Sequence, residues 1–326
     1  MPSPADAPAD AHSGSPAPAP LERLSAGALD WLGRHLDHFD PFSPSARSAT
    51  HGRAKAALEL ALLCHCAARP AGVPEALGEA AALVRKLWQD PRFPGLLDEV
   101  PAYASTYRLI HAALAPDGID DTQCRGALTR LDPGFLSPRG KSAYRRIEIR
   151  YYADKAGARH TIEPYAELVP RSPLVAFRAA ARTGDVTELD APPLGTPEAY
   201  ALTHTAFYLG DFGRTAPGLT GDALAHARGL VDRLLRHSVA HDRWDLAAEL
   251  VLTQFILGSD PLRTPSGAAA VECLVRAQRP DGAIPGRSAA LAASAAAPVG
   301  EFFGKAYHTT LVTALMALAV SSPGPS

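Results

Sequence analysis

Apolar residues recur along most of the chain at intervals of three and four positions, and strict alternation of apolar and polar residues is almost absent. Spacings of three and four place side chains on one face of a helix, whereas alternation would indicate strands. Proline and glycine interrupt the pattern, because proline cannot continue a helix and glycine tolerates the left-handed conformation at helix ends. The sequence therefore predicts an all-α protein of about twelve helices, at residues 21–38, 51–68, 74–89, 100–115, 121–130, 140–157, 163–182, 196–211, 219–238, 242–257, 264–278 and 301–320. For the segment 163–182 the alternative is a helix broken near Pro170 and Pro173,.

The even-numbered helices of this series are the more apolar ones. The segments LELALLCHCA, YALTHTAFYL, DLAAELVLTQFIL and YHTTLVTALMALA are hydrophobic nearly all round, which is typical of helices enclosed by others. Odd-numbered helices such as DALAHARGLVDRLLRH are amphipathic and are expected to face water on one side. This alternation predicts an inner and an outer ring, an α/α toroid of about six helical hairpins. A two-layer helical stack also fits the pattern.

The two ends of the chain differ from its middle. Residues 1–20 are mostly Pro, Ala, Ser and Asp with almost no large apolar side chain, so burial there cannot offset the entropy of ordering. The ending SSPGPS is similar and shorter. We expect a disordered leader at 1–20, a single helical domain at 21–320 and a disordered tail at 321–326.

Charge and hydropathy exclude several classes of partner. The chain carries 32 Lys and Arg against 34 Asp and Glu, a net charge of -2, so no positive excess attracts nucleic acid or an anionic membrane. No window reaches the roughly 18 apolar residues of a spanning helix, and the first residues lack the pattern of a signal peptide. The four cysteines are few for the length, which is typical of reduced thiols. We expect a cytoplasmic protein.

Polar residues on the enclosed helices are the candidates for chemistry. Such residues are rare and costly to bury, so one on nearly every even-numbered helix favours a shared site. Taken singly, His204 fits a hydrogen-bonded core histidine, and Glu249 fits an ion pair with Arg145. The candidate catalytic residues are His204, Glu249, His308 and Asp211, and the candidate substrate contacts are Tyr200, His111, Tyr107, Glu59, Arg145 and Tyr307.

Two chemistries fit these candidates. Two neutral imidazoles with one carboxylate suit zinc or non-haem iron. His204 and His308 with a carboxylate from Glu249 or Asp211 are therefore a candidate metal-binding set, and His204, Glu249 and His308 are the leading choice. Without a metal, the same groups would perform acid and base catalysis on a substrate held by tyrosines. The sequence contains no HExxH, GxGxxG, GxxxxGK[ST] or GxSxG motif, which disfavours nucleotide binding and the common serine hydrolase chemistry.

Four segments carry a resemblance to known proteins. YALTHTAFYLGDFG, WDLAAELVLTQFILG, AQRPDGAIPG and AYHTTLVTALMALA resemble an all-helical bacterial protein family of unknown function, over most of the chain after residue 20. The segment QRPDGAIPG, with Gln278, Asp281 and Gly282, is similar to turns in the terpenoid cyclase and prenyltransferase toroids. The aspartate-rich motif of those cyclases is absent, and the cysteines do not reproduce the zinc pattern of lanthionine cyclase toroids. The resemblance implies an architecture and a biosynthetic role but transfers no reaction.

Two functions are therefore open. We expect an enzyme that tailors a small molecule or a modified peptide in a polar pocket inside a helical toroid, with or without a divalent metal. The alternative is a non-catalytic scaffold that binds a ligand or a peptide, as helical arrays commonly do. A catalytic pocket requires clustered candidates and shifted histidine pKa values, whereas a scaffold would scatter them in hydrogen-bonded pairs.

Overall fold

The computed structural model describes residues 19–45, 52–68, 74–179, 191–286 and 299–321. All regular secondary structure in these ranges is helical, as the spacing of apolar residues predicts. The elements are α1 (Pro20–Arg34), α2 (Leu36–Phe39), α3 (Ala54–Ala67), η1 (Glu75–Leu77), α4 (Gly78–Gln89), α5 (Phe93–Leu96), α6 (Ala104–Ala113), α7 (Thr122–Thr129), α8 (Ala143–Lys155), α9 (Tyr165–Leu168), η2 (Val169–Arg171), α10 (Pro173–Ala176), α11 (Thr196–Leu209), η3 (Asp211–Gly213), α12 (Gly221–Ala240), α13 (Trp244–Ile256), α14 (Pro265–Ala277) and α16 (Val299–Val320).

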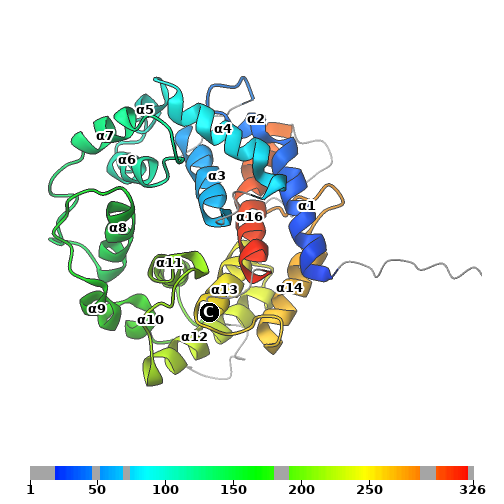
Figure 1. The fold of residues 1–326 in the computed structure, drawn as a ribbon. Helices are drawn as coiled ribbons and strands as arrows, with labels where there is room; N and C mark the ends of the chain where they lie inside the picture. Colours follow the sequence, from blue (N-terminus) through cyan, green and yellow to red (C-terminus); the bar gives the residue numbers. More distant parts are fainter. Residues whose placement is uncertain (1–18, 46–51, 69–73, 180–190, 287–298, 322–326) are drawn as a thin grey trace, which may run out of the picture.

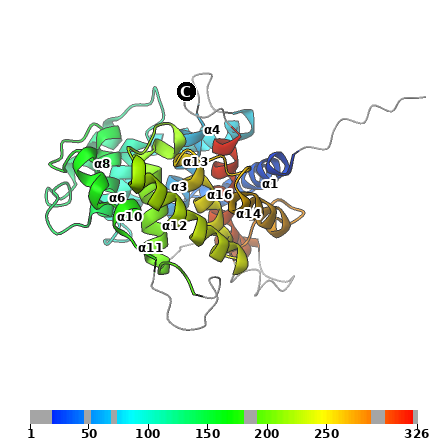
Figure 2. The same cartoon turned by 90° about the horizontal axis from the view of Figure 1, so that it is seen from below.

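Six of these helices contact one another in a closed order. Helix α3 packs against α6, α6 against α8, α8 against α11, α11 against α13, α13 against α16, and α16 back against α3. The other long helices pack on members of this cycle: α4 on α3, α7 on α6, α12 and α14 on α13, and α1 on α16 (Figure 1). Seen from below, α6 and α8 lie at one side of the molecule and α1 and α14 at the other (Figure 2).

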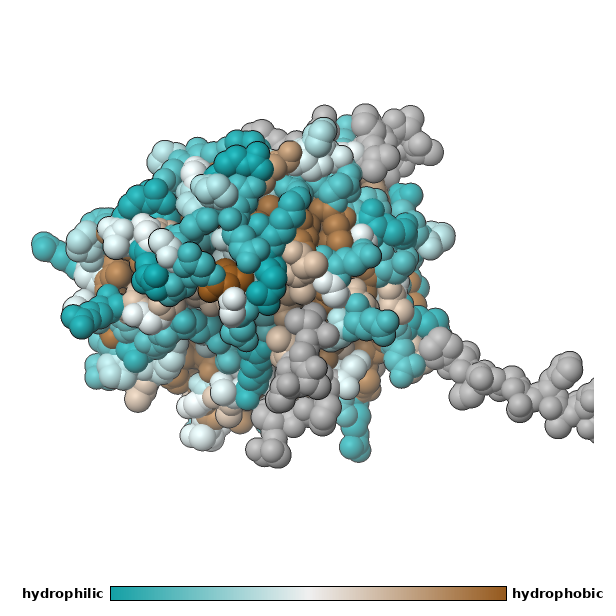
Figure 3. Space-filling model, turned by 45° about the horizontal axis from the view of Figure 1, so that its top comes forward, coloured by the Kyte–Doolittle hydropathy of each residue, from teal (hydrophilic) through white to brown (hydrophobic). Residues whose placement is uncertain are grey.

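Burial differs sharply between α13, a helix of the cycle, and α12, which packs on it from outside. Helix α13 buries every residue from Leu246 to Gln254, so it is enclosed on all sides. Helix α12 buries a stripe that includes Leu230, Val231 and Leu234 and leaves the opposite face to solvent. This difference matches the apolar and amphipathic patterns of the two segments. Hydrophilic residues cover most of the face shown in Figure 3, with smaller apolar patches between them.

Local chemistry sets the helix ends. Ser142 accepts a hydrogen bond from the backbone N–H of Arg145 at 3.2 Å at the start of α8, and Thr264 accepts one from Gly267 at 3.2 Å at the start of α14. Each satisfies a backbone donor that has no partner inside the helix. Helix α11 ends at Gly210, where a Cβ atom would lie 2.4 Å from Cγ2 of Ile256. Glycine at this position lets α11 and α13 approach closely.

The segment 163–182 is not one continuous helix, and the expected break near Pro170 and Pro173 is present. The segment 164–176 instead forms α9, η2 and α10, and residues 177–179 are not helical. Three prolines explain the difference, because Pro164, Pro170 and Pro173 each stand at or beside the start of one of these short elements. Proline supplies no backbone N–H and restricts the residue before it, so a continuous helix cannot form. The short helix α5 was not predicted.

The predicted leader at 1–20 and tail at 321–326 lie almost entirely outside the described residues.

None of the helices in the described part of the chain combines the length and the apolar character needed to cross a bilayer.

Candidate functional site

A cavity of about 180 Å³, called here the inner cavity, is lined by side chains from every helix of the closed cycle. Its volume is close to the ~150 Å³ of an engineered cavity that holds benzene, and it is smaller than most ligand pockets. The inner cavity therefore fits a small molecule. It is lined by Lys55, Leu58, Glu59, Leu62, Tyr107, Ile110, Tyr152, His204, Phe207, Tyr208, Phe212, Glu249, His308, Leu311, Val312 and Leu315.

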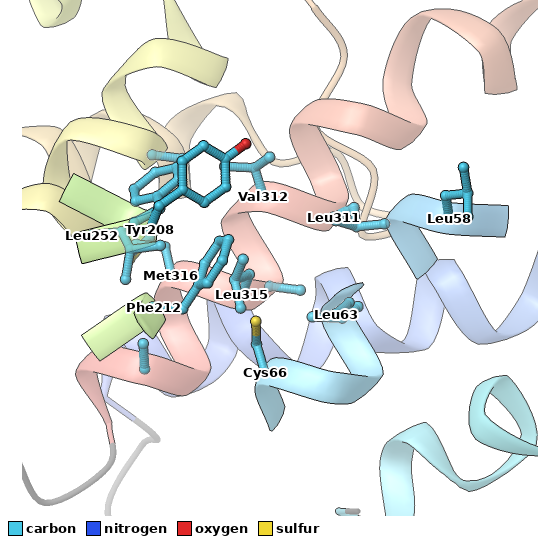
Figure 4. Packing of buried hydrophobic residues seen from close by; sticks show 14 of the residues in the cluster. Leu58, Leu63, Cys66, Tyr208, Phe212, Leu252, Leu311, Val312, Leu315 and Met316 are labelled. Carbon is cyan, nitrogen blue, oxygen red and sulfur yellow. The ribbon is translucent and has the colours of Figure 1, made fainter. Parts of the chain in front are cut away.

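The walls of the inner cavity are mainly apolar. Tyr208 and Phe212 lie close to Val312 and Leu315 of α16, and Leu311 and Leu58 continue the wall (Figure 4). The two histidines on this wall keep more accessible surface than their neighbours, with 34% for the side chain of His204 and 39% for that of His308. A small-molecule site usually has a mostly apolar wall with a few polar groups that face the ligand.

His308 and Glu59 form the first polar pair of the inner cavity. Nδ1 of His308 lies 3.2 Å from Oε1 of Glu59. Lys55, one turn before Glu59 on α3, donates a hydrogen bond to the same oxygen at 2.5 Å and another to the Tyr307 hydroxyl at 3.2 Å. The carboxylate thus stands between two cationic or potentially cationic groups, and Nε2 of His308 is the ring nitrogen left for a ligand.

The charges in this group shift both pKa values. Burial alone would raise the pKa of Glu59, but Lys55 and His308 outweigh burial and hold the pKa well below its usual value. Burial alone would lower the pKa of His308, but the charge of Glu59 outweighs it and raises the pKa. Glu59 is therefore ionised, and His308 carries a proton to higher pH than a free histidine does.

His204 and Glu249 form the second polar pair. Nε2 of His204 lies 3.4 Å from Oε1 of Glu249, and Nδ1 lies 3.4 Å from the Tyr144 hydroxyl. The other oxygen of Glu249 accepts a hydrogen bond from Thr203 at 2.5 Å. Burial alone would lower the pKa of His204, but the charge of Glu249 outweighs it and raises the pKa.

Tyrosines supply the remaining polar atoms. The Tyr208 hydroxyl donates a hydrogen bond to Oε1 of Glu148 at 3.3 Å, and burial raises the pKa of both Tyr152 and Tyr208 well above the usual value. Burial also raises the pKa of Tyr107 to about 12. These phenols remain neutral at physiological pH, so they can donate hydrogen bonds but cannot accept a proton as phenolates.

A strained turn places one aromatic ring of the inner cavity. Asp211, Phe212 and Gly213 follow α11 with φ angles of 43°, 54° and 91°. Only glycine adopts this region without cost, so two non-glycine residues there store strain that the surroundings must offset. The Phe212 ring stacks on Phe207 with centroids 5.3 Å apart and lies 6.3 Å from the Tyr208 ring. The turn thus holds Phe212 against the inner cavity.

Five of the residues predicted from the sequence line the inner cavity together. They are His204, Glu249, His308, Glu59 and Tyr107. The sequence paired the histidines with Glu249 or Asp211, whereas the structure pairs His308 with Glu59. Lys55 and Glu59 are four positions apart and so share one face of a helix, but this spacing alone does not show that α16 lies opposite that face,.

The other five predicted residues contact different partners. Tyr200 donates to Asp245, and Asp211 accepts from Tyr151 at 2.7 Å and pairs with Lys155 at 3.0 Å. These residues do not line the inner cavity.

The remaining three also have contacts of their own. Arg145 pairs with Glu148 and not with Glu249, and Tyr307 accepts from Lys55. His111 is fully buried and stacks on Trp88 with ring centroids 4.9 Å apart. Sequence analysis gave no role to Tyr208 or Phe212, because apolar and aromatic positions on an enclosed helix look alike whether they face a cavity or the core.

The predicted metal set is not assembled. His204 pairs with Glu249, whereas His308 pairs with Glu59 on another helix. Within the residues that the structure describes, no three His, Cys, Asp or Glu side chains are grouped as a metal ion requires. Two separate histidine–carboxylate pairs do not fit a zinc or iron centre, which needs three or four ligands around one point.

Comparison with protein families gives one match. The family model described as "Domain of unknown function (DUF6895)" matches residues 25–318, and the chain belongs to this family. A search of curated proteins gives no match. A search of solved structures gives none either. The family carries no stated activity, and the geometry of the inner cavity is what indicates a function,.

Proposed function

We propose that this family member is an enzyme that moves protons on a small, largely apolar molecule held in the inner cavity. The observation that carries the proposal is the pair formed by His308 and the ionised Glu59, 3.2 Å apart on a wall that is otherwise mainly apolar. A carboxylate beside one nitrogen of an imidazole fixes the ring and supports protonation at the other nitrogen. His308 is thus the proposed general base or acid, and Glu59 its orienting partner.

The pair of His204 and Glu249 supplies a second imidazole that could exchange a proton with the substrate. His204 also lines the inner cavity, and its pKa is raised by Glu249 after the opposing effect of burial. Two histidines of raised pKa on α11 and α16 would allow one to accept a proton while the other donates one. Lys55 keeps Glu59 ionised, and the neutral Tyr208 and Tyr152 phenols would orient a polar group of the substrate.

The size of the inner cavity favours one substrate class over another. About 180 Å³ accommodates a molecule comparable to a small aromatic ring,. A folded or modified peptide would need far more room, so we propose a small-molecule substrate. We further propose that the six helices in closed contact are the inner wall of an α/α toroid, for which the order of helix contacts is the support.

Untargeted mass spectrometry of a bacterial metabolite extract would test the proposed activity. The purified protein, His308→Gln and His241→Gln are each incubated with the extract. His241 lies at the end of α12 and does not line the inner cavity, so its variant is the matched control. We expect metabolites that the wild type and the control convert and His308→Gln does not. Conversion at the same rate by His308→Gln would refute the role of His308. Binding without any conversion would support the non-catalytic alternative.

A further inference from the structure

A second cavity, called here the basic cavity, lies at the C-terminal ends of α3 and α6. Its volume is about 780 Å³, within the range of ordinary small-molecule sites,. It shares no lining residue with the inner cavity. Alanine is the commonest residue of its wall, from α3, α4, α6 and the residues that follow α3 and α6, and Lys155 from α8 and Arg214 from the segment after η3 complete it.

Three cations from distant parts of the sequence converge on this wall. Arg85, Lys155 and Arg214 line the basic cavity, and among its lining residues Asp117 is the one carboxylate. The interaction of a charge with an anion is stronger where water is partly excluded, as it is around the half-buried side chains of Lys155 and Arg214,. The chain as a whole has a net charge of -2, so these cations form a local positive region and not part of a general positive excess.

Protein contacts hold the cations in place without using all of their donors. Arg85 donates to the backbone carbonyl of Asp117 at 3.0 Å, and Lys155 pairs with Asp211 at 3.0 Å. Arg214 donates to the backbone carbonyls of His65, in the last turn of α3, and of Ala68, just after it, and its Nη1 lies 3.9 Å from Asp211. An arginine has five N–H donors and a lysine three, so these contacts leave donors for a ligand.

The pKa of His65 responds to the charges around the basic cavity. Its ring lines the cavity and lies 3.4 Å from Nη1 of Arg214 through Nε2. Burial, together with the charges of Lys155 and Arg214, lowers the pKa of His65 to about 4, although Asp211 and Asp117 act in the opposite direction. The ring is therefore neutral near pH 7, and the cationic groups around it outweigh the carboxylates.

We propose that the basic cavity binds the anionic head group of a small molecule, a phosphate ester or a carboxylate, with the apolar remainder of the ligand against the alanine-rich wall. Arg85, Lys155 and Arg214 hold the anion. Arginine suits this role because its planar fork matches two oxygens of a phosphate or carboxylate. The proposal is independent of the chemistry assigned to the inner cavity.

Calorimetric titration with inorganic phosphate tests the proposal, and benzoate forms a second arm that distinguishes a phosphate from a carboxylate ligand. The matched variants are Arg85→Gln and Lys86→Gln, neighbours on α4 of which only Arg85 lines the basic cavity. Both side chains are exposed, so both variants should fold. We expect Arg85→Gln to weaken binding of the preferred anion by about tenfold and Lys86→Gln to leave it unchanged. Equal binding by the two variants would mean adventitious surface binding and would overturn the proposal.

Histidine NMR on the wild-type protein gives a second readout that does not depend on a variant folding. The signal of His65 is assigned with His65→Gln, and its pKa is measured with phosphate, with benzoate, and with chloride at equal ionic strength. A bound anion offsets Lys155 and Arg214, so the pKa of His65 should rise with phosphate or benzoate and stay near 4 with chloride,. An unchanged pKa of His65 under all three conditions would overturn the proposal.

Discussion

Nδ1 of His308, on α16, lies 3.2 Å from Oε1 of Glu59, on α3, and this contact joins segments near the two ends of the described chain. Each residue stands on a helix whose other faces are largely apolar. Helix α16 packs directly on α3, and this contact completes the cycle of six helices. The two side chains meet because these two helices are in contact. The same two ionisable groups therefore contribute to the packing of α16 on α3 and line the inner cavity.

The pair should make stability depend on pH in a defined direction. The pKa of His308 is raised in the folded protein, so its contribution is present below about pH 6.5 and is lost as the pH rises through the folded value,. The pKa of Glu59 is lowered, so its contribution is present above about pH 4.5 and is lost as the pH falls through the folded value,. The contact should stabilise the protein most between these two limits.

Urea unfolding of the wild type and of His308→Gln from pH 5.5 to 9 measures this effect. We expect the difference in unfolding free energy between the two proteins to shrink as the pH rises. Lys305→Gln, which removes a charge from an exposed ion pair on the same helix, is the control and should show no such trend,. A difference that is constant over the whole range would contradict the pairing of His308 with Glu59.

Glu249 should govern the protonation of His204. Glu249→Gln keeps the size of the side chain and an oxygen that can accept from Thr203, but it removes the charge 3.4 Å from His204. Burial would then act unopposed by Glu249, and the pKa of His204 should fall below its wild-type value,. NMR titration of the His204 ring protons measures the change. Glu272→Gln, an exposed position on α14, should leave the titration of His204 where it was.

The helical fold was predictable because helix periodicity is a local property of the chain. The apolar run of α13 and the stripe of α12 follow directly from the spacing of residues such as Leu230 and Leu234,. At 163–182 apolar residues kept a helical spacing, but Pro170 and Pro173 removed backbone donors, and the alternative of a break at these prolines is the one that the structure confirms. Local sterics outweighed periodicity there.

The candidate site was predictable in its residue types but not in its pairing. Ionisable groups on enclosed helices indicated a cavity, and His204, Glu249 and His308 do line one. Which carboxylate faces His308 depends on the closure of α16 onto α3, a contact between residues far apart in sequence. His111 shows the opposite error, because a histidine at helical spacing with Tyr107 can point into the core instead. Its ring stacks on Trp88.

His111 should make the protein less stable in mild acid. It is fully buried, and burial lowers its pKa to about 4, so the folded protein holds it neutral. The unfolded chain takes up a proton at about pH 6.5, and folding stability is therefore lost as the pH falls from there toward 4. The total loss is about 3 kcal/mol. Urea unfolding at pH 7 and pH 5 should show a smaller loss for His111→Leu than for the wild type. Equal losses would mean that His111 titrates normally in the folded state.

Gly213 should be required for the turn that positions Phe212. Its φ of 91° lies where a side chain is strained, and a Cβ atom would come within 2.7 Å of Cε1 of Phe255. We expect Gly213→Ala to lower the unfolding free energy by about 1–3 kcal/mol.

Gly229→Ala is the matched control, because Gly229 lies inside α12 and a Cβ atom there would meet nothing within 4 Å. That variant should gain about 0.5–1 kcal/mol from the helix propensity of alanine. Opposite signs for the two substitutions, measured by urea unfolding at one pH, would show that the left-handed turn is a property of the folded protein. A Gly213→Ala variant as stable as the wild type would show that the chain can close the inner cavity without it.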